Sequence, residues 1–282
     1  MKSFAINPAL NAAVDAAKAA GKLMRQNLRR VKKVNAETSH DIKLELDVRC
    51  QKLIERKLHA AFPKIALLGE EGVSGPADAA FRWVVDPIDG TVNYASGIPH
   101  ACVSIALQVQ GSGSNVQGPK SKVQSRRNRR STLNPEPSTV LGVVYDPFTD
   151  ELWTAVRGRA AQLNGKVIHV SRRRKLAECI VSIGFAKSRE SLECALPYFL
   201  WLARRVRKIR MMGSAALALA YVATGRFDAY IERGINIWDI AAGGLILECA
   251  GGKFWREPIR GPHRFRMIAS NGLVHCQLRI PH

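Results

Sequence analysis

Long apolar runs and paired cysteines are absent from this chain of 282 residues, and acidic residues are scarce. No segment approaches the roughly 18 consecutive apolar residues of a transmembrane helix, so we expect no membrane association. The six cysteines are scattered, with no C-x-x-C pair and no histidine clustered beside them. This spacing favours neither a zinc site nor a disulfide framework, and we expect a reducing, cytoplasmic setting.

The shortage of acidic residues gives the chain 43 lysines and arginines against 23 aspartates and glutamates, a formal net charge of +20. Part of the excess lies between Gly111 and Thr139, where apolar periodicity is lost and no aromatic residue occurs. We interpret this segment as a surface insertion, disordered or a long hairpin loop. Basic clusters also occur at Arg172 to Lys175 and Arg204 to Arg210. They indicate either solvated faces or attraction to nucleic acid or another polyanion.

Apolar periodicity predicts an opening helix and a second helix from about Leu46 to Ala61. Short apolar runs with strand character follow, and Asn164-Gly165 is typical of a hairpin turn. In the second half, predicted strands and helices alternate, which favours a sheet covered by helices.

The most informative motif is Asp86-Pro87-Ile88-Asp89-Gly90-Thr91, which follows the apolar run Trp83-Val84-Val85. Two aspartates at a strand end can both reach one cation, and oxygen-only ligation suits Mg2+ better than Zn2+ or copper. Gly90 and Thr91 would begin a helix, whose N-terminal N–H groups attract anions. The motif points to phosphate chemistry, although a turn with a capped helix is an alternative interpretation.

Two distant segments add acidic residues. Glu70 and Glu71 follow the apolar run 65–68, and Asp239 stands in Trp238-Asp239-Ile240-Ala241-Ala242-Gly243, at the start of an apolar helical segment. Taken separately, the glutamates could belong to a solvated loop and Asp239 could be an N-cap. The three motifs in this order are poorly explained by those alternatives.

The sequences of these motifs and their order along the chain resemble those of the inositol monophosphatase family of Mg2+-dependent phosphatases. The resemblance continues through Gly97-Ile98-Pro99-His100, Gly213-Ser214-Ala215-Ala216 and Asp228-Ala229-Tyr230-Ile231-Glu232. Haloacid-dehalogenase-type phosphatases carry D-x-D-G-T near the chain start, whereas here two residues separate the aspartates well inside the chain. We therefore interpret Asp86 as a metal ligand and not as a covalent nucleophile.

The resemblance implies an αβαβα layered sandwich, of the inositol monophosphatase and fructose-1,6-bisphosphatase type, with mixed α/β and α+β character. We expect an N-terminal α+β half over residues 1–139, containing the insertion, and a C-terminal α/β half over residues 140–282. The active site would lie between the two halves.

By the same resemblance, Mg2+ is the cofactor, with two to three ions per site. The expected protein ligands of the first two ions are Glu70, Asp86, Asp89, Asp239 and the backbone carbonyl of Ile88. A third, weaker ion is expected beside Glu70. Because a phosphate monoester is anionic, metal charge must neutralise it before hydroxide can approach.

The resemblance also implies the catalytic residues. Thr91 and Glu70 are expected to position the attacking water, and Asp47 to accept its proton through the Thr91 hydroxyl. The segment around Asp47 departs from the family's D-x-x-T-x-x-D pattern, because Leu44 replaces the usual threonine and Lys43 is unusual. A helix-starting Asp47 is therefore a competing interpretation.

For the substrate, the resemblance places phosphate on the N–H groups of Gly90 and Thr91. The leaving alcohol would meet Asp239, Glu232 and the turn Gly213-Ser214-Ala215. A carboxylate at Glu232 suits a polyol such as inositol, and an exposed strand end is the alternative.

The predicted function is hydrolysis of inositol monophosphate by a lithium-sensitive enzyme that forms homodimers. Val92-Asn93-Tyr94 after the metal motif lies nearer to inositol monophosphatases than to the rest of the superfamily. The alternatives are a related phosphatase acting on histidinol phosphate, a sugar bisphosphate or 3′-phosphoadenosine 5′-phosphate, or an RNA- or ribonucleoprotein-associated regulatory protein.

Overall fold

The computed structural model describes residues 4–30, 34–37, 42–110, 137–184 and 189–278. Most of the basic insertion predicted at 111–139 therefore lies outside the described residues. The strands that flank it end at Val109 and begin at Ser138, close to the predicted positions.

The elements of the first half include both predicted helices, and the second of them spans nearly the predicted residues. They are α1 (Ile6–Asn27), β1 (Val34–Glu37), β2 (Ile42–Leu44), α2 (Glu45–Ala61), β3 (Ala66–Gly69), β4 (Gly72–Ser74), β5 (Phe81–Asp89), α3 (Thr91–Ala95) and β6 (Cys102–Val109).

In the second half, the Asn164-Gly165 hairpin is confirmed between β9 and β10. The elements are β7 (Ser138–Asp146), β8 (Glu151–Val156), β9 (Gln162–Leu163), β10 (Lys166–Val167), η1 (Leu176–Glu178), β11 (Ile180–Ile183), α4 (Arg189–Ala203), β12 (Lys208–Arg210), α5 (Ala215–Ala223), β13 (Ala229–Asn236), α6 (Ile237–Cys249), β14 (Lys253–Pro258), β15 (Arg264–Ser270) and η2 (His275–Gln277).

Two large sheets organise the chain. The eight-stranded sheet has the order β10-β9-β8-β7-β6-β5-β3-β4, and its only parallel pair is β3 with β5. The five-stranded sheet has the order β12-β11-β13-β15-β14, in which β11 runs parallel to both of its neighbours. The predicted division between residues 139 and 140 falls within β7, a strand of the larger sheet that pairs with β6, and it stays a prediction.

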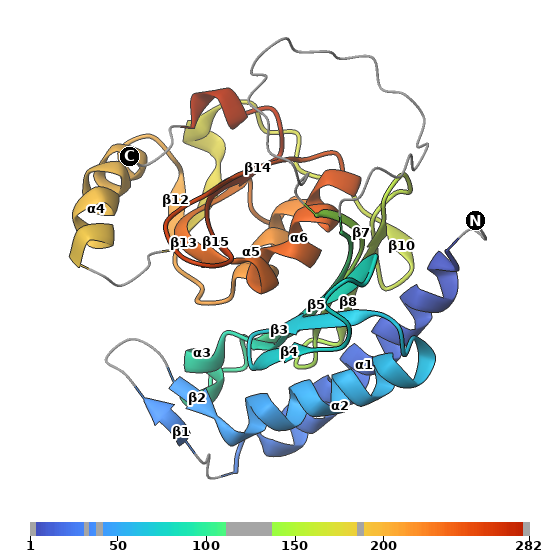
Figure 1. The fold of residues 1–282 in the computed structure, drawn as a ribbon. Helices are drawn as coiled ribbons and strands as arrows, with labels where there is room; N and C mark the ends of the chain where they lie inside the picture. Colours follow the sequence, from blue (N-terminus) through green and yellow to red (C-terminus); the bar gives the residue numbers. More distant parts are fainter. Residues whose placement is uncertain (1–3, 31–33, 38–41, 111–136, 185–188, 279–282) are drawn as a thin grey trace.

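The layers confirm the predicted αβαβα sandwich. In Figure 1, α1 and α2 cover one face of the eight-stranded sheet, and α5 and α6 lie between the two sheets. Helix α4 covers the outer face of the smaller sheet, where Tyr198 and Leu202 pack on Val181 and Ile231. None of the described helices is long and apolar enough to span a membrane.

Successive side chains of β5 point to opposite faces of the sheet and so contribute to two different hydrophobic cores. Trp83 and Val85 face the core under α1 and α2, whereas Val84 faces the core around α5 and α6. Because both faces are covered, the strand is apolar and buried from Trp83 to Val85, directly before Asp86. The aspartates at its end are consequently carried into the interior of the molecule.

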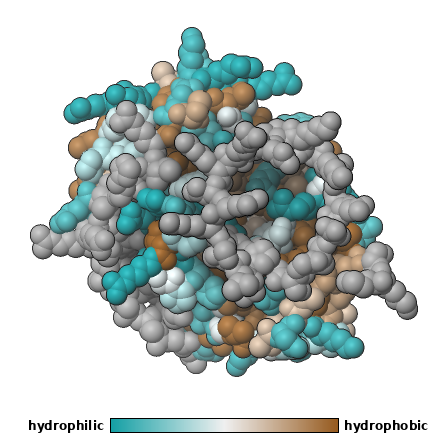
Figure 2. All heavy atoms as spheres, turned by 45° about the horizontal axis from the view of Figure 1, so that its top comes forward, coloured by the Kyte–Doolittle hydropathy of each residue, from teal (hydrophilic) through white to brown (hydrophobic). Residues whose placement is uncertain are grey.

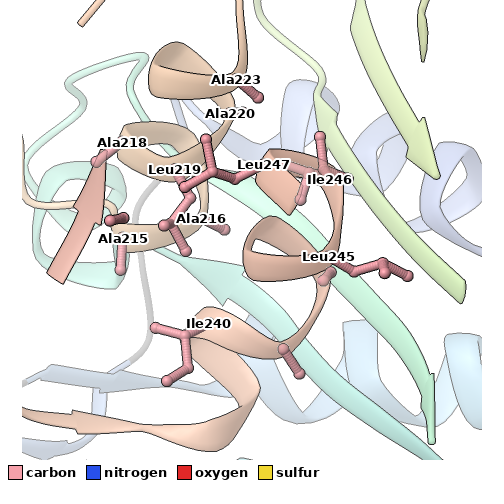
Figure 3. Packing of buried hydrophobic residues seen from close by; sticks show 14 of the residues in the cluster. Ala215, Ala216, Ala218, Leu219, Ala220, Ala223, Ile240, Leu245, Ile246 and Leu247 are labelled. Carbon is pink, nitrogen blue, oxygen red and sulfur yellow. The ribbon is translucent and has the colours of Figure 1, made fainter. Parts of the chain in front are cut away.

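Small residues allow α5 and α6 to lie close together between the sheets. Figure 3 shows α5 beside α6, with the labelled alanines of α5 in the same buried cluster as Ile240, Leu245 and Leu247 of α6. A Cβ atom on Gly243 would lie 2.7 Å from the Cβ of Leu219, so glycine is needed at this contact. A Cβ atom on Gly142 would likewise lie 2.7 Å from the carbonyl oxygen of Ala242, where β7 meets α6. This packing brings the N-terminal ends of both helices to the site described below.

Candidate metal centre and active site

A β-bulge places Asp86 and Asp89 on the same side of the larger sheet. Residues three apart on a regular strand point to opposite faces. In the pairing of β5 with β6, however, Asp86 lies opposite Ser104 and Asp89 opposite Cys102, so β5 carries one extra residue between them. The bulge turns Asp89 toward the face that Asp86 occupies. The D-x-x-D spacing thereby becomes a pair of converging carboxylates.

Asp239 joins them from the first turn of α6. Its Oδ2 accepts the backbone N–H of Asn236 at 2.8 Å, a capping contact that fixes the side chain at the helix start. Carboxylate oxygens of Asp86, Asp89 and Asp239 lie within 4.8 Å of one another. The structure therefore brings together three of the predicted metal ligands from two distant segments.

The electrostatics of the cluster are those of a cation site. Burial, followed by repulsion from Glu70, Asp89 and Asp239, raises the pKa of Asp86 well above its usual value. Burial and the charges of Asp89 and Glu70 raise the pKa of Asp239 in the same way. In the part of the chain that the structure describes, no lysine or arginine forms an ion pair with the three aspartates. Converging carboxylates without a counter-charge require protons or a cation.

Asp89 is held by the N-terminal end of α5. Its Oδ2 accepts the Ser214 hydroxyl at 2.6 Å and the Ala216 N–H at 2.7 Å, and its Oδ1 accepts the Ala215 N–H at 3.1 Å. The Cys102 thiol also lies 3.6 Å from Oδ2. Burial raises the pKa of Asp89, and these hydrogen bonds oppose the shift. Sequence reasoning assigned the Gly213-Ser214-Ala215 turn to the substrate and missed both its contact with Asp89 and the part of Ala216.

Glu70 lies just beyond β3, beside the aspartate cluster. Its backbone N–H donates to the Val85 carbonyl at 3.2 Å, which ties the end of β3 to β5. It stands outside the tight group of three, yet its charge contributes to the raised pKa of Asp86 and of Asp239. The predicted placement of Glu70 next to the metal ligands thus has electrostatic support.

The turn after Asp89 has the backbone geometry that the Gly-Thr sequence suggests. Gly90 has φ +95°, and a Cβ there would lie 2.9 Å from the carbonyl oxygen of His100, so only glycine fits. The Thr91 hydroxyl donates to the Ile88 carbonyl at 2.9 Å. Helix α3 has only five residues, so an anion here would depend on individual N–H groups more than on a helix dipole.

Asn93 connects this turn to the segment that precedes α5. Its side-chain amide donates to the carbonyls of His100 at 3.0 Å and of Met212 at 2.8 Å. A Cβ on Gly213, which has φ +75°, would lie 3.0 Å from the same amide nitrogen. Sequence reasoning used Asn93 only to compare families. The role of Asn93 became visible only in the structure, where its side chain lies against the glycine turn at Gly213.

Asp47 occupies the first turn of α2 and is buried. Its Oδ2 accepts the backbone N–H of Leu44 at 2.8 Å, so the helix-starting interpretation describes a contact that exists. Burial raises the pKa of Cys50 to about 12, and the negative charge of Asp47 contributes to this shift. Burial and the charge of Asp47 also raise the pKa of Tyr94. Because Tyr94 belongs to α3, Asp47 lies on the side of the site where Thr91 begins that helix.

Glu232 reaches the site from β13. The Tyr230 hydroxyl donates to its Oε2, and a Cβ atom on Gly184 would collide with the same carboxylate. Burial, with a smaller contribution from Asp89, raises the pKa of Glu232 to about 7, against the opposing hydrogen bond from Tyr230. The side chain is thus an oriented carboxylate beside the aspartate cluster and not an exposed strand end.

The residues present fit a hard divalent cation. All three converging groups are carboxylates, which supply the oxygen ligands that hard cations prefer. No cysteine or histidine belongs to the group of three aspartates. Thiolate-rich and imidazole-rich sites for softer metals are built differently.

A layered αβαβα fold with an acidic oxygen site at the meeting point of its two sheets defines the class of metal-dependent phosphatases. The chain matches the family model described as the inositol monophosphatase family over residues 6–117 and 133–271. The protein therefore belongs to the inositol monophosphatase family. The residues between the two matched stretches lie within the predicted basic insertion.

Relatives across this family are similar over almost the whole chain. A protein named Nus factor SuhB from Xylella fastidiosa is 35% identical over 275 residues, covering 94% of this chain and 90% of the relative. An inositol-1-monophosphatase from Rhizobium meliloti is 36% identical over 257 residues, covering 89% and 86%. The structure of the extragenic suppressor protein SuhB from Bartonella henselae has a TM-score of 0.80 at 33% identity, covering 95% of each chain.

Proposed function

We propose that the protein is a Mg2+-dependent phosphate monoester hydrolase that acts on inositol monophosphate by water attack. The observation that carries the proposal is the convergence of the buried Asp86 and Asp89 with the half-buried Asp239, and the raised pKa values of these carboxyl groups favour a cation site. Membership of the family and the name of the Rhizobium meliloti relative support the reaction and the substrate. Glu232, oriented by Tyr230, adds an acceptor suited to a polyol hydroxyl.

In this mechanism the acidic residues hold two to three Mg2+ ions, with Glu70 and the Ile88 carbonyl beside the three aspartates. When bound, Mg2+ would neutralise the phosphate and increase the acidity of the attacking water. Thr91 and Glu70 orient that water, and Asp47 accepts its proton through the Thr91 hydroxyl. The N–H groups of Gly90 and Thr91 hold the phosphate.

The leaving alcohol is placed by groups at the opposite wall of the site. Asp239 and Glu232 face it, together with the turn formed by Gly213, Ser214 and Ala215. Because a site that hydrogen-bonds a hydroxyl rejects an analogue lacking it, Glu232 would favour a polyol over a simple alkyl or aryl phosphate.

The finer parts of the proposal concern the setting of the enzyme. We expect inhibition by lithium, a homodimer and a cytoplasmic location. The cytoplasmic location is supported by the five cysteines whose side chains the structure describes, all of which are free: Cys50, Cys102, Cys179, Cys249 and Cys276.

Phosphate release from a substrate panel tests the proposal directly. The panel is myo-inositol-1-phosphate, histidinol phosphate, fructose-1,6-bisphosphate and 3′-phosphoadenosine 5′-phosphate, each with Mg2+ or EDTA. We expect metal-dependent turnover of the inositol phosphate that Asp89→Asn abolishes. Preferential turnover of another compound would reassign the substrate, and a folded protein inactive on all four would refute the proposal for these substrates.

A further inference from the structure

The phosphatase proposal leaves the excess of positive charge unexplained. Among the described residues, two basic segments that are far apart in the sequence meet beside the five-stranded sheet. Across residues 172–178 and 204–210, nine residues are basic and Glu178 is the only acidic one. Arg173 is accounted for, because it pairs with the buried Asp228 at 3.0 Å. The other eight form what we call the basic surface: Arg172, Arg174, Lys175, Arg204, Arg205, Arg207, Lys208 and Arg210.

Backbone hydrogen bonds hold the two segments together. The N–H groups of Arg207 and Lys208 donate to the Cys179 carbonyl at 2.9 and 3.3 Å. The Cys179 thiol in turn donates to the Lys175 carbonyl at 3.2 Å. Strands β11 and β12 continue this contact with Ile180 opposite Lys208. Figure 1 shows η1, β12 and α4 gathered on this side of the smaller sheet.

The eight side chains are exposed and uncompensated. Each is solvent-exposed, and within the described ranges none forms an ion pair with a carboxylate. The hydrophilic areas in Figure 2 show that charged and polar groups are common on the described surface, so exposure alone decides little. This region is distinguished by the near absence of negatively charged residues from its two segments.

Structural roles explain only part of the cluster. β12 is the edge strand of its sheet, and charges at Lys208 and Arg210 discourage pairing with another chain. Arg204 and Arg205 follow the end of α4, where cations are favoured by the helix dipole. Neither reason applies to Arg172, Arg174 and Lys175 in the segment before η1, or to Arg207 between the helix and the strand.

The chemistry of the basic surface selects its ligand. Six of the eight residues are arginines, whose planar guanidinium groups pair with phosphate oxygens in a bidentate manner. The Arg205 guanidinium lies 4.7 Å from the ring centroid of Trp201, so an aromatic face is present beside the cations. A polyanion with repeated phosphates matches a surface that continues from the segment before η1 to β12.

We propose that the basic surface binds the phosphate backbone of single-stranded RNA. The surface is separate from the aspartate cluster and uses no residue of the phosphatase machinery. Because phosphate neutralisation releases counterions, binding would weaken steeply with salt and depend little on base sequence.

The test compares two charge reversals in the full chain. One variant carries Arg204→Glu, Arg207→Glu and Lys208→Glu, which leave the Arg205–Trp201 pair and the hydrogen bonds and ion pairs between described side chains in place. The matched control carries Lys52→Glu, Arg56→Glu and Lys57→Glu on the exposed face of α2, which changes the net charge equally. Fluorescence anisotropy with a labelled oligouridine measures RNA affinity at several salt concentrations.

We expect the first variant to lose at least about tenfold in affinity and to reduce the salt slope by roughly two to three, while the control stays within about threefold of wild type. Phosphate release should be unchanged in both, which separates this proposal from the phosphatase proposal. Both variants should melt cooperatively, the first with the small loss expected from a glutamate at the end of α4, which shows that the variants fold. Equal weakening by both variants, or no RNA binding by wild type, would overturn the proposal. If the protein bound phosphatidylglycerol vesicles more tightly than the oligouridine, and lost this binding in the first variant, the proposal would be overturned in favour of a membrane surface.

Discussion

Two conservative substitutions at the metal site should differ in their effect on the stability of the metal-free protein. Both Asp86→Asn and Asp89→Asn remove one negative charge from the cluster. Asparagine at position 86 can keep the acceptor for the Ile88 N–H, which Asp86 Oδ1 now accepts at 3.0 Å, and can donate to Asp239. Asparagine at position 89 cannot replace both oxygens of Asp89, because donors from Ser214, Ala215 and Ala216 occupy both.

The magnitudes follow from charge repulsion and hydrogen bonding. Two full charges 4.8 Å apart repel by about 3.5 kcal/mol at an effective dielectric constant of about 20, and partial protonation already relieves much of this. We expect Asp86→Asn to stabilise the metal-free protein by about 1–2 kcal/mol. At position 89 the same gain is offset, because the side-chain NH2 group of asparagine would face the N–H and O–H donors that now bind Asp89. Leaving these donors without an acceptor costs about 1–3 kcal/mol. The two variants should therefore differ by about 2 kcal/mol, or roughly 3–4 °C in melting temperature for a chain of this length.

The pH dependence gives a second readout of the same reasoning. Because the folded pKa of Asp86 and Asp239 is raised, the metal-free folded state binds more protons than the unfolded chain. Its stability should fall as pH rises from the usual carboxyl pKa of about 4 through the raised values. Asp86→Asn should flatten this decline.

Differential scanning calorimetry at about pH 8, with EDTA and with excess Mg2+, tests these expectations, and phosphate release should be lost in both variants. The reasoning is refuted if Asp86→Asn lowers the metal-free melting temperature as much as Asp89→Asn does. It also fails if Mg2+ raises the melting temperature of both variants as much as that of wild type.

Three further predictions concern the same site. Mg2+ affinity should drop at least about tenfold between about pH 8 and pH 6, because protons compete for carboxylates with raised pKa values; titration calorimetry that finds no change would contradict this. Gly90→Ala should destabilise the protein by at least about 1–2 kcal/mol through its positive φ and the contact with His100, with loss of phosphate release, as chemical denaturation and activity assays will show. Glu232→Gln should lower kcat/KM for inositol phosphate about tenfold or more and spare p-nitrophenyl phosphate, and an equal loss on both would exclude a role in polyol recognition.

Local sequence determined the elements that carry the site. The apolar run before Asp86 produced a strand, the Asn164-Gly165 pair produced a hairpin, and Glu45–Ala61 became a helix close to the predicted bounds. These features depend on alternation, helical period and turn chemistry, all of which are readable over a few residues. The acidic motifs and their order were sufficient to identify the resemblance to the family, which is confirmed, whereas the ligand set that they suggest stays a prediction.

Tertiary structure decided how those residues meet. The bulge between Asp86 and Asp89 arises from pairing with β6, and the donors to Asp89 come from the start of α5. Neither contact has a local signal, because the bulge depends on the register of β5 with β6 and the donors to Asp89 depend on the packing of α5 between the two sheets. The basic surface is of the same kind, since its two segments are neighbours only through β11 and β12. The local sequence determines which helix, strand or turn each residue occupies. The distances between carboxylates or cations that are far apart in the chain are determined by tertiary packing, because packing follows from which faces of the helices and sheets must be buried.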